Sequence, residues 1–130
     1  MTTLLNVGVP VRSTVATFSS VGAGTTVLDE VEVDVYGSVG WDVTFRDNST
    51  GDRGRFSITA VHNGTNAVDA SNTAFEISGQ ALLPALTNQF TFSTTLNGTG
   101  AAQVMRLNCT VTAGTWRVDV GRSSHVGSPL

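Results

Sequence analysis

Cysteine and lysine are the residues that this sequence most obviously lacks. Cys109 is the single cysteine in 130 residues, so no internal disulfide can form. Lysine is absent, and charged residues make up 13% of the chain, about half of the usual globular share. The net charge of −3 and the lack of a basic tract predict that the protein does not bind nucleic acid. The surface must therefore be mainly Thr, Ser, Asn and Gly, which suits a protein that packs against neighbours.

Long apolar runs are also absent. No stretch approaches the roughly 20 apolar residues that cross a bilayer, so we expect no membrane partner. Residues 1–6 have neither the basic residues nor the apolar core of a secretory signal, and we expect a soluble protein made in the cytoplasm. The length fits one domain, which burial can stabilise without metals or disulfides.

Alternation of apolar and polar residues is the strongest pattern in the chain, and helical periodicity is nearly absent. It predicts about seven or eight short strands with turn signals roughly every 8–12 residues. The sequence therefore predicts an all-β fold, a single antiparallel β-sandwich or jelly-roll-like domain. The side chains expected to face its core are Val31, Val33, Val35, Trp41, Val43, Phe45, Phe56, Ile58, Ala60, Phe75, Ile77, Phe90, Phe92, Met105, Leu107, Cys109, Val111, Trp116, Val118 and Val120.

The first 26 residues are less regular than the rest. Residues 7–11 favour a strand, with Pro10 at a sheet edge. Two interpretations remain open: an extended arm that adds a strand to a neighbour's sheet, or two ordinary strands of the same sandwich. We assign residues 1–26 to this N-terminal extended arm or to edge strands, 27–122 to the sandwich domain and 123–130 to a flexible tail. Residues 80–86, which include Pro84, are expected to form a connection.

Residues that support catalysis are few and scattered. Cys109 falls on the apolar face of a predicted strand, where a thiol behaves as a small hydrophobe. His62 ends a strand beside a turn, His125 lies in the predicted tail, and no Gly-x-Ser-x-Gly motif is present. Two histidines and one cysteine far apart do not have zinc-ligand spacing. We therefore predict no catalytic, cofactor or metal site, and a protein that is not an enzyme.

Two acidic patterns have a functional and an ordinary interpretation. Residues 47–52 place oxygen donors around a glycine as in a calcium loop, but Ile58 stands where such a loop closes with Glu, which favours a hairpin turn. Glu30, Glu32 and Asp34 alternate along one strand face. Paired carboxylates can hydrolyse glycosides, yet a solvent-facing strand is the commoner role. These three carboxylates, which we call the acidic stripe, are also able to pair with arginine on a partner.

The aromatic residues Trp41, Trp116 and Tyr36 could form a sugar-binding platform. Both tryptophans fall on the apolar side of their strands, which favours core packing.

Four segments between Trp41 and Arg122 resemble a small β-sandwich domain of tailed-bacteriophage virion proteins. They are WDVTFRD (residues 41–47), ITAVHNG (58–64), MRLNCTVT (105–112) and WRVDV (116–120). In such proteins a strand, a turn with a His-x-Gly pattern and a late strand with an Arg-Leu pair recur in this order. The match covers about two-thirds of the chain and involves sandwich strands, not residues with chemistry.

The resemblance implies a virion structural role. It implies a capsid decoration (cement) protein that sits as a homotrimer on the capsid surface and bridges neighbouring capsomers, with the major capsid protein or another virion protein as partner. The alternatives are a tail or fibre component and a carbohydrate-binding (adhesion) module. The residues we expect at the interface are Val7, Val9, Pro10, Val11, Arg12, Glu30, Glu32 and Asp34.

Overall fold

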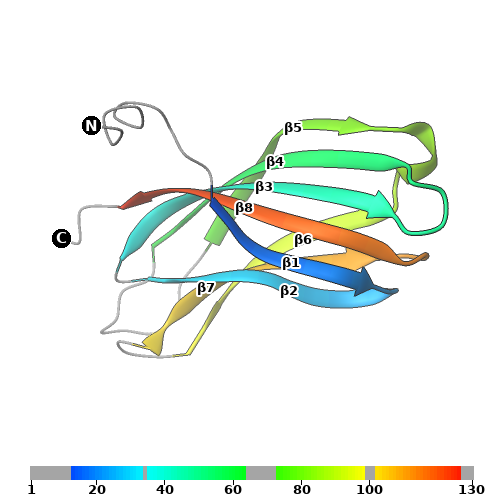
Figure 1. Cartoon of the computed structure of the whole chain (residues 1–130). Coiled ribbons are helices and arrows are strands. Elements are labelled where there is room, and N and C mark those ends of the chain that lie inside the picture. The colour runs from blue at the N-terminus through cyan, green and yellow to red at the C-terminus, as the bar shows by residue number, and fades with distance from the viewer. Residues whose placement is uncertain (1–12, 34, 64–72, 99–101, 127–130) are drawn as a thin grey trace, which may run out of the picture.

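A computed structural model describes residues 13–33, 35–63, 73–98 and 102–126 of the protein. Within these residues, eight strands form two antiparallel sheets that pack as a sandwich (Figure 1), which confirms the predicted fold class. The strands are β1 (Ser13–Val21), β2 (Gly24–Glu32), β3 (Tyr36–Asp47), β4 (Arg53–His62), β5 (Thr73–Leu82), β6 (Phe90–Asn97), β7 (Val104–Val111) and β8 (Trp116–Val126). A short 3-10 helix, η2 (Pro84–Leu86), precedes β6. No helix in the described ranges is long and apolar enough to cross a membrane.

The two sheets differ in width. The larger sheet has the strand order β1-β8-β3-β4-β5, and the smaller sheet has the order β2-β7-β6. The first two strands thus pair with the last two, β1 with β8 and β2 with β7, as expected of a jelly-roll-like connection. Because the larger sheet has two more strands, part of its inner face extends beyond the smaller one.

The core contains most of the side chains that alternation assigned to it. Trp41, Val43 and Phe45 of β3 are buried in one core cluster with residues of β4, β7 and β8. The ring of Phe45 stacks on Phe90 with centroids 3.8 Å apart, and it meets Phe56 edge-on. Such pairs add to the burial of apolar area, so this aromatic cluster is the centre of the contact between the sheets.

Three of the predicted core positions are wrong, and two of them lie on β5. Phe75 and Ile77 of β5 are 38% and 39% exposed. They face the same side of the sheet as their partners Ala60 and Ile58 on β4, which are buried. Their direction was therefore predicted correctly, but β5 is the edge strand of the wider sheet, and too little of the smaller sheet lies over it to bury them.

Several predicted boundaries also shift. Residues 30–36 are not one strand, because β2 ends at Glu32, a backbone hydrogen bond from Val35 N to the Glu32 carbonyl closes a turn, and β3 begins at Tyr36. Val35 is consequently exposed. Residues 80–82 belong to β5, because they pair with residues 54–56 of β4, and the connection begins after them.

The proposed limits of the sandwich domain cut through strands of the structure. β2 begins at Gly24 and crosses the limit between residues 26 and 27, while β8 continues to Val126 because its end pairs with the start of β3. Residues 13–21 and 24–26 lie in the edge strands β1 and β2. The remaining residues of the predicted arm, 1–12, lie outside the described residues, as do residues 127–130 of the predicted tail.

Candidate functional site

The cysteine and the histidines do not form a reactive cluster in the described part of the chain. Cys109 is buried in β7, and burial raises the pKa of its thiol to about 12. It is therefore a neutral thiol and a poor nucleophile at ordinary pH. His62 has its Nε2 atom 2.6 Å from the Tyr36 carbonyl oxygen, and the side chain of His125 lies outside the described residues. Among the described residues, no group of three or more His, Cys, Asp or Glu is placed to hold a metal ion.

The turn at residues 47–52 uses its oxygen atoms within the hairpin. The Asp47 carboxylate accepts hydrogen bonds from the backbone N–H groups of Ser49 and Thr50, at 2.7 and 3.2 Å. The Thr50 hydroxyl accepts another from the Asp52 N–H, and Gly51 takes the positive φ of 80° that closes the turn. This is the local bonding of an Asx turn, and it supports the hairpin interpretation over the calcium loop.

The acidic stripe is partly neutralised by the chain itself. Glu30 accepts a hydrogen bond from Arg106 Nε of the neighbouring strand β7 at 3.0 Å, and both side chains are exposed. Glu32 is exposed at the end of β2, and Asp34 lies outside the described residues. The other predicted interface residues, Val7, Val9, Pro10, Val11 and Arg12, lie outside them as well. Of the predicted interface residues, the structure therefore describes Glu30 and Glu32 alone.

The aromatic residues considered for a sugar platform belong to the core. Trp41 and Trp116 are buried, and the Trp116 indole N–H donates to the Ala113 carbonyl. Tyr36 is half-buried, with the guanidinium of Arg122 5.7 Å from the centre of its ring. The burial of both tryptophans confirms core packing.

An ion pair that the sequence did not reveal joins the two sheets. Asp29 of β2 accepts two hydrogen bonds from Arg122 of β8, at 2.8 and 2.9 Å, and one from the Trp41 indole of β3 at 2.8 Å. The hydrogen bond to Asp29 is the main cause of the raised pKa of Arg122. Because Asp29 follows an irregularity in the β2–β7 register after Val27, it turns inward beside the buried Leu28. The only signal in the sequence was the broken alternation at residues 27–29.

The exposed edge of the larger sheet is the strongest candidate for a functional surface. β5 pairs with β4 on one side, and it is the edge strand on the other. Nearly every residue along it is exposed. Beside it, Val61 of β4 is 45% exposed. We call the first half of this strand, Thr73–Ile77, together with Val61 the β5 edge.

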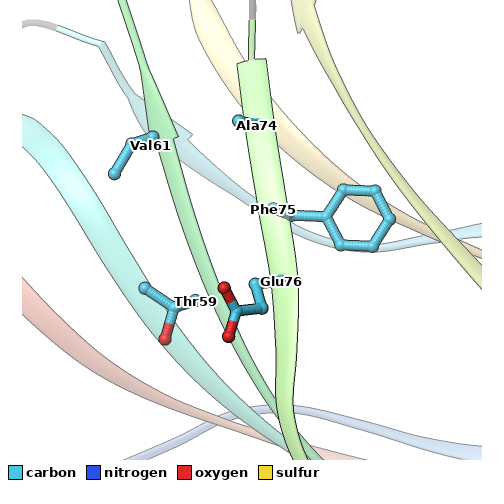
Figure 2. Close-up of a pocket in the computed structure, with 5 residues that line it drawn as sticks. All are labelled: Thr59, Val61, Ala74, Phe75 and Glu76. Carbon is cyan, nitrogen blue, oxygen red and sulfur yellow. The ribbon is translucent and has the colours of Figure 1, made fainter.

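Apolar side chains lie on both faces of the β5 edge. An open depression of about 380 Å³ is lined by Thr59, Val61, Ala74, Phe75 and Glu76. Figure 2 shows Thr59, Val61 and Glu76 on one side of the strand pair, while the ring of Phe75 points to the other. Ile77 shares the Phe75 side because it is two residues along the strand. The β5 edge thus offers an added strand apolar contacts on both faces.

The chemistry of the β5 edge suits binding to another strand. An edge strand carries a row of backbone N–H and C=O groups that can pair with another chain, and proteins usually blunt such edges with Lys, Pro or bulges. β5 contains neither Lys nor Pro, and its one charged residue is Glu76. An irregularity in the β4–β5 register, at Ser57 and Ile58, divides β5 into two paired halves. Phe75 and Ile77 lie in the first half.

Comparisons with known proteins place the chain in no family. No family model matches the sequence, and no curated protein matches it. Among solved structures, the chain is similar to the tailspike protein of Acinetobacter phage vB_ApiP_P1, with 12% identity and a TM-score of 0.32. The alignment covers 88% of this chain and 22% of the tailspike, so this chain spans about a fifth of that protein. A likeness this weak establishes neither a shared fold nor a shared function.

Proposed function

We propose that this protein is a structural module that docks onto other proteins of a larger assembly, and that the assembly is a bacteriophage virion. The observation that carries the docking role is the β5 edge, where Phe75 and Ile77 of the edge strand β5 lie exposed on one face and Val61 of β4 lies exposed on the other. A sheet edge of this kind is a common site of strand addition.

The virion assignment rests on the sequence resemblance to phage sandwich domains. Its four segments fall in or beside β3, β4, β7 and β8, which supply most of the buried core. The resemblance thus concerns the framework of the domain, while the β5 edge lies outside its segments. In the finer form of the proposal, the protein is a homotrimeric cement protein that binds the major capsid protein at the capsid surface.

The mechanism of such a protein is mechanical. A protein that binds only the assembled shell stabilises that shell by mass action, because binding lowers the free energy of the bound state. Docking across a seam between capsomers adds contact area that disassembly must expose again. The low charge of the chain limits electrostatic repulsion between copies packed closely on one shell.

Mass-spectrometric counting of copies in purified phage particles tests this proposal. A cement protein is expected in many copies per particle, in proportion to the capsomers. A few copies per particle would instead indicate a tail or fibre component. If the protein is absent from particles, the virion role is wrong.

A second measurement tests the role of the β5 edge in docking. The Phe75→Ser/Ile77→Ser double variant is expected to bind particles more weakly than the wild-type protein. The Val27→Ser variant is the matched control, because Val27 is also an exposed hydrophobic residue, 42% exposed, but lies on β2 of the smaller sheet. Equal loss of binding in both variants would contradict docking through β5.

A further inference from the structure

The inner face of the β5 edge has apolar side chains that one more strand would cover. At its start, β5 is tied to β6, because the Thr94 hydroxyl donates to the Thr73 hydroxyl at 2.7 Å and Thr73 donates to the Thr94 carbonyl at 3.1 Å. Beyond this tie, Phe75 and Ile77 are each more than a third exposed. A strand added beside β5 with apolar side chains on this face would cover them.

One segment of this chain has the matching pattern. In residues 5–11 every second residue is a branched apolar one, namely Leu5, Val7, Val9 and Val11. As a strand, this segment would present four apolar side chains on one face. The alternation lies immediately before β1, which begins at Ser13.

Pro10 is compatible with a strand that pairs along one side only. Proline has no N–H to donate, so in a sheet it occupies edges where that position faces solvent. Successive residues of a strand direct their backbone groups to opposite sides. With Pro10 directed away from β5, the backbone groups of Val7, Val9 and Val11 are directed toward it. The apolar residues of the segment are then also the ones that bond to the edge.

A chain cannot supply this segment to its own β5. β1, which begins at Ser13, lies at the opposite edge of the larger sheet from β5 (Figure 1). Four strand spacings separate β1 from β5, about 19 Å in total. Val11 is two residues from Ser13 and can lie at most about 7 Å from it. Pairing of residues 7–11 with β5 therefore requires a second copy of the chain.

We propose that residues 5–11 of one copy add as a strand to β5 of a second copy and cover Phe75 and Ile77. This inference deepens the proposed function and rests on its assignment of β5 as a docking edge. The charges are compatible, because Glu76 is the one charged residue of β5 and Arg12 is the charged residue next to the segment. Pairing of β5 with β5 of another copy is disfavoured, because an antiparallel arrangement centred on Glu76 places two carboxylates side by side.

Disulfide cross-linking between two different variants of the full chain tests this inference. Val7→Cys, Val9→Cys and Val11→Cys chains are each mixed with an Ile77→Cys chain under mild oxidation. A disulfide forms only when the two β-carbons come within about 4.5 Å. The control mixture replaces the Ile77→Cys chain with a Val27→Cys chain, whose cysteine is exposed on the other sheet. Cys109 stays in all chains because it is buried.

The expected result is a linked dimer between one of the arm variants and Ile77→Cys, at a yield at least tenfold above the Val27→Cys control. Phe75→Cys serves as the second acceptor if the Ile77→Cys chain loses its β-sheet circular dichroism. Three outcomes would overturn the inference: equal yields in test and control, no linked dimer with either acceptor, and homodimers of the Ile77→Cys chain alone. An intramolecular disulfide in the Val9→Cys/Ile77→Cys double variant would overturn it as well.

The copy count in particles separates failure of this inference from failure of the proposed function. If the protein is abundant in particles but gives no specific cross-link, the docking role stands, and the addition of residues 5–11 to β5 of a second copy is wrong. If the cross-link is specific but the protein is absent from particles, residues 5–11 do add to β5 of a second copy, and the virion role is wrong.

Discussion

Replacement of Asp29 by alanine should strongly destabilise the fold. The Asp29 side chain is 9% exposed, and it accepts three hydrogen bonds that connect β2 of the smaller sheet with β3 and β8 of the larger one. Removing it leaves the Arg122 guanidinium and the Trp41 indole N–H without their acceptor between the sheets.

The magnitude follows from the burial of the groups left behind. Breaking a buried ion pair by removing one partner costs about 3–5 kcal/mol, and Arg122, at 22% side-chain exposure, places the Asp29→Ala variant toward the lower end. The unfolding entropy of 130 residues is about 0.27 kcal/mol per degree near 60 °C. A loss of about 3–4 kcal/mol therefore lowers the melting temperature by roughly 11–15 °C.

Urea unfolding followed by tryptophan fluorescence measures this loss, because Trp41 itself contacts Asp29. The matched control is Glu30→Ala, the next residue on β2, whose pair with Arg106 is exposed on both sides. That surface pair is worth about 1 kcal/mol or less. If Asp29→Ala and Glu30→Ala lose similar amounts of unfolding free energy, the pair between the sheets contributes no more than a surface pair.

Three other predictions concern the core, a turn and the buried thiol. Phe45→Ala should lower the free energy of unfolding by about 3–5 kcal/mol, because Phe45 is fully buried and stacked on Phe90; a loss below about 1 kcal/mol in urea unfolding would contradict its central position. Gly114→Ala should cost about 1–2 kcal/mol, because Gly114 has φ of 89° and a Cβ there would lie 3.0 Å from Trp116 Nε1, whereas Gly22→Ala, with open space around it, should cost less. Burial raises the pKa of Cys109 from 9.0 to about 12. As the pH rises, the thiol therefore loses its proton in the unfolded state before it does so in the folded state. The stability present below pH 9 is lost as the pH rises toward 12. Between pH 8 and pH 10 the wild type should therefore lose about 1.4 kcal/mol more than Cys109→Ala, and equal slopes in urea unfolding at the two pH values would refute this.

The alternation of side chains was a reliable guide within single strands. Trp41, Val43 and Phe45 of β3 are buried as predicted. Trp116, Val118 and Val120 of β8 are buried as predicted as well. This succeeds because successive side chains of a strand point to opposite faces, so the apolar set identifies the inner face without knowledge of any partner. The hairpin turn at residues 47–52 was predictable for a similar reason, since its bonding is local.

The sequence pattern failed where burial depends on another sheet. Phe75 and Ile77 alternate in the same way as Phe56 and Ile58, yet only the second pair is buried. The difference is the position of β5 at the edge of a wider sheet, which no local pattern encodes. For this reason the sequence did not indicate the β5 edge as a surface, because its apolar residues have the same pattern as core residues.

By itself, the amino-acid sequence determined the class of fold, the inner face of most strands and the sparsely charged, lysine-free surface. Only the tertiary structure decided which strands lie at edges and which distant residues meet, such as Asp29 and Arg122, which are 93 positions apart. The physical reason is that the direction of a side chain is set by its own backbone, whereas its burial is set by the strands packed over it. The β5 edge shows this difference, since its apolar residues point inward and remain open to a partner.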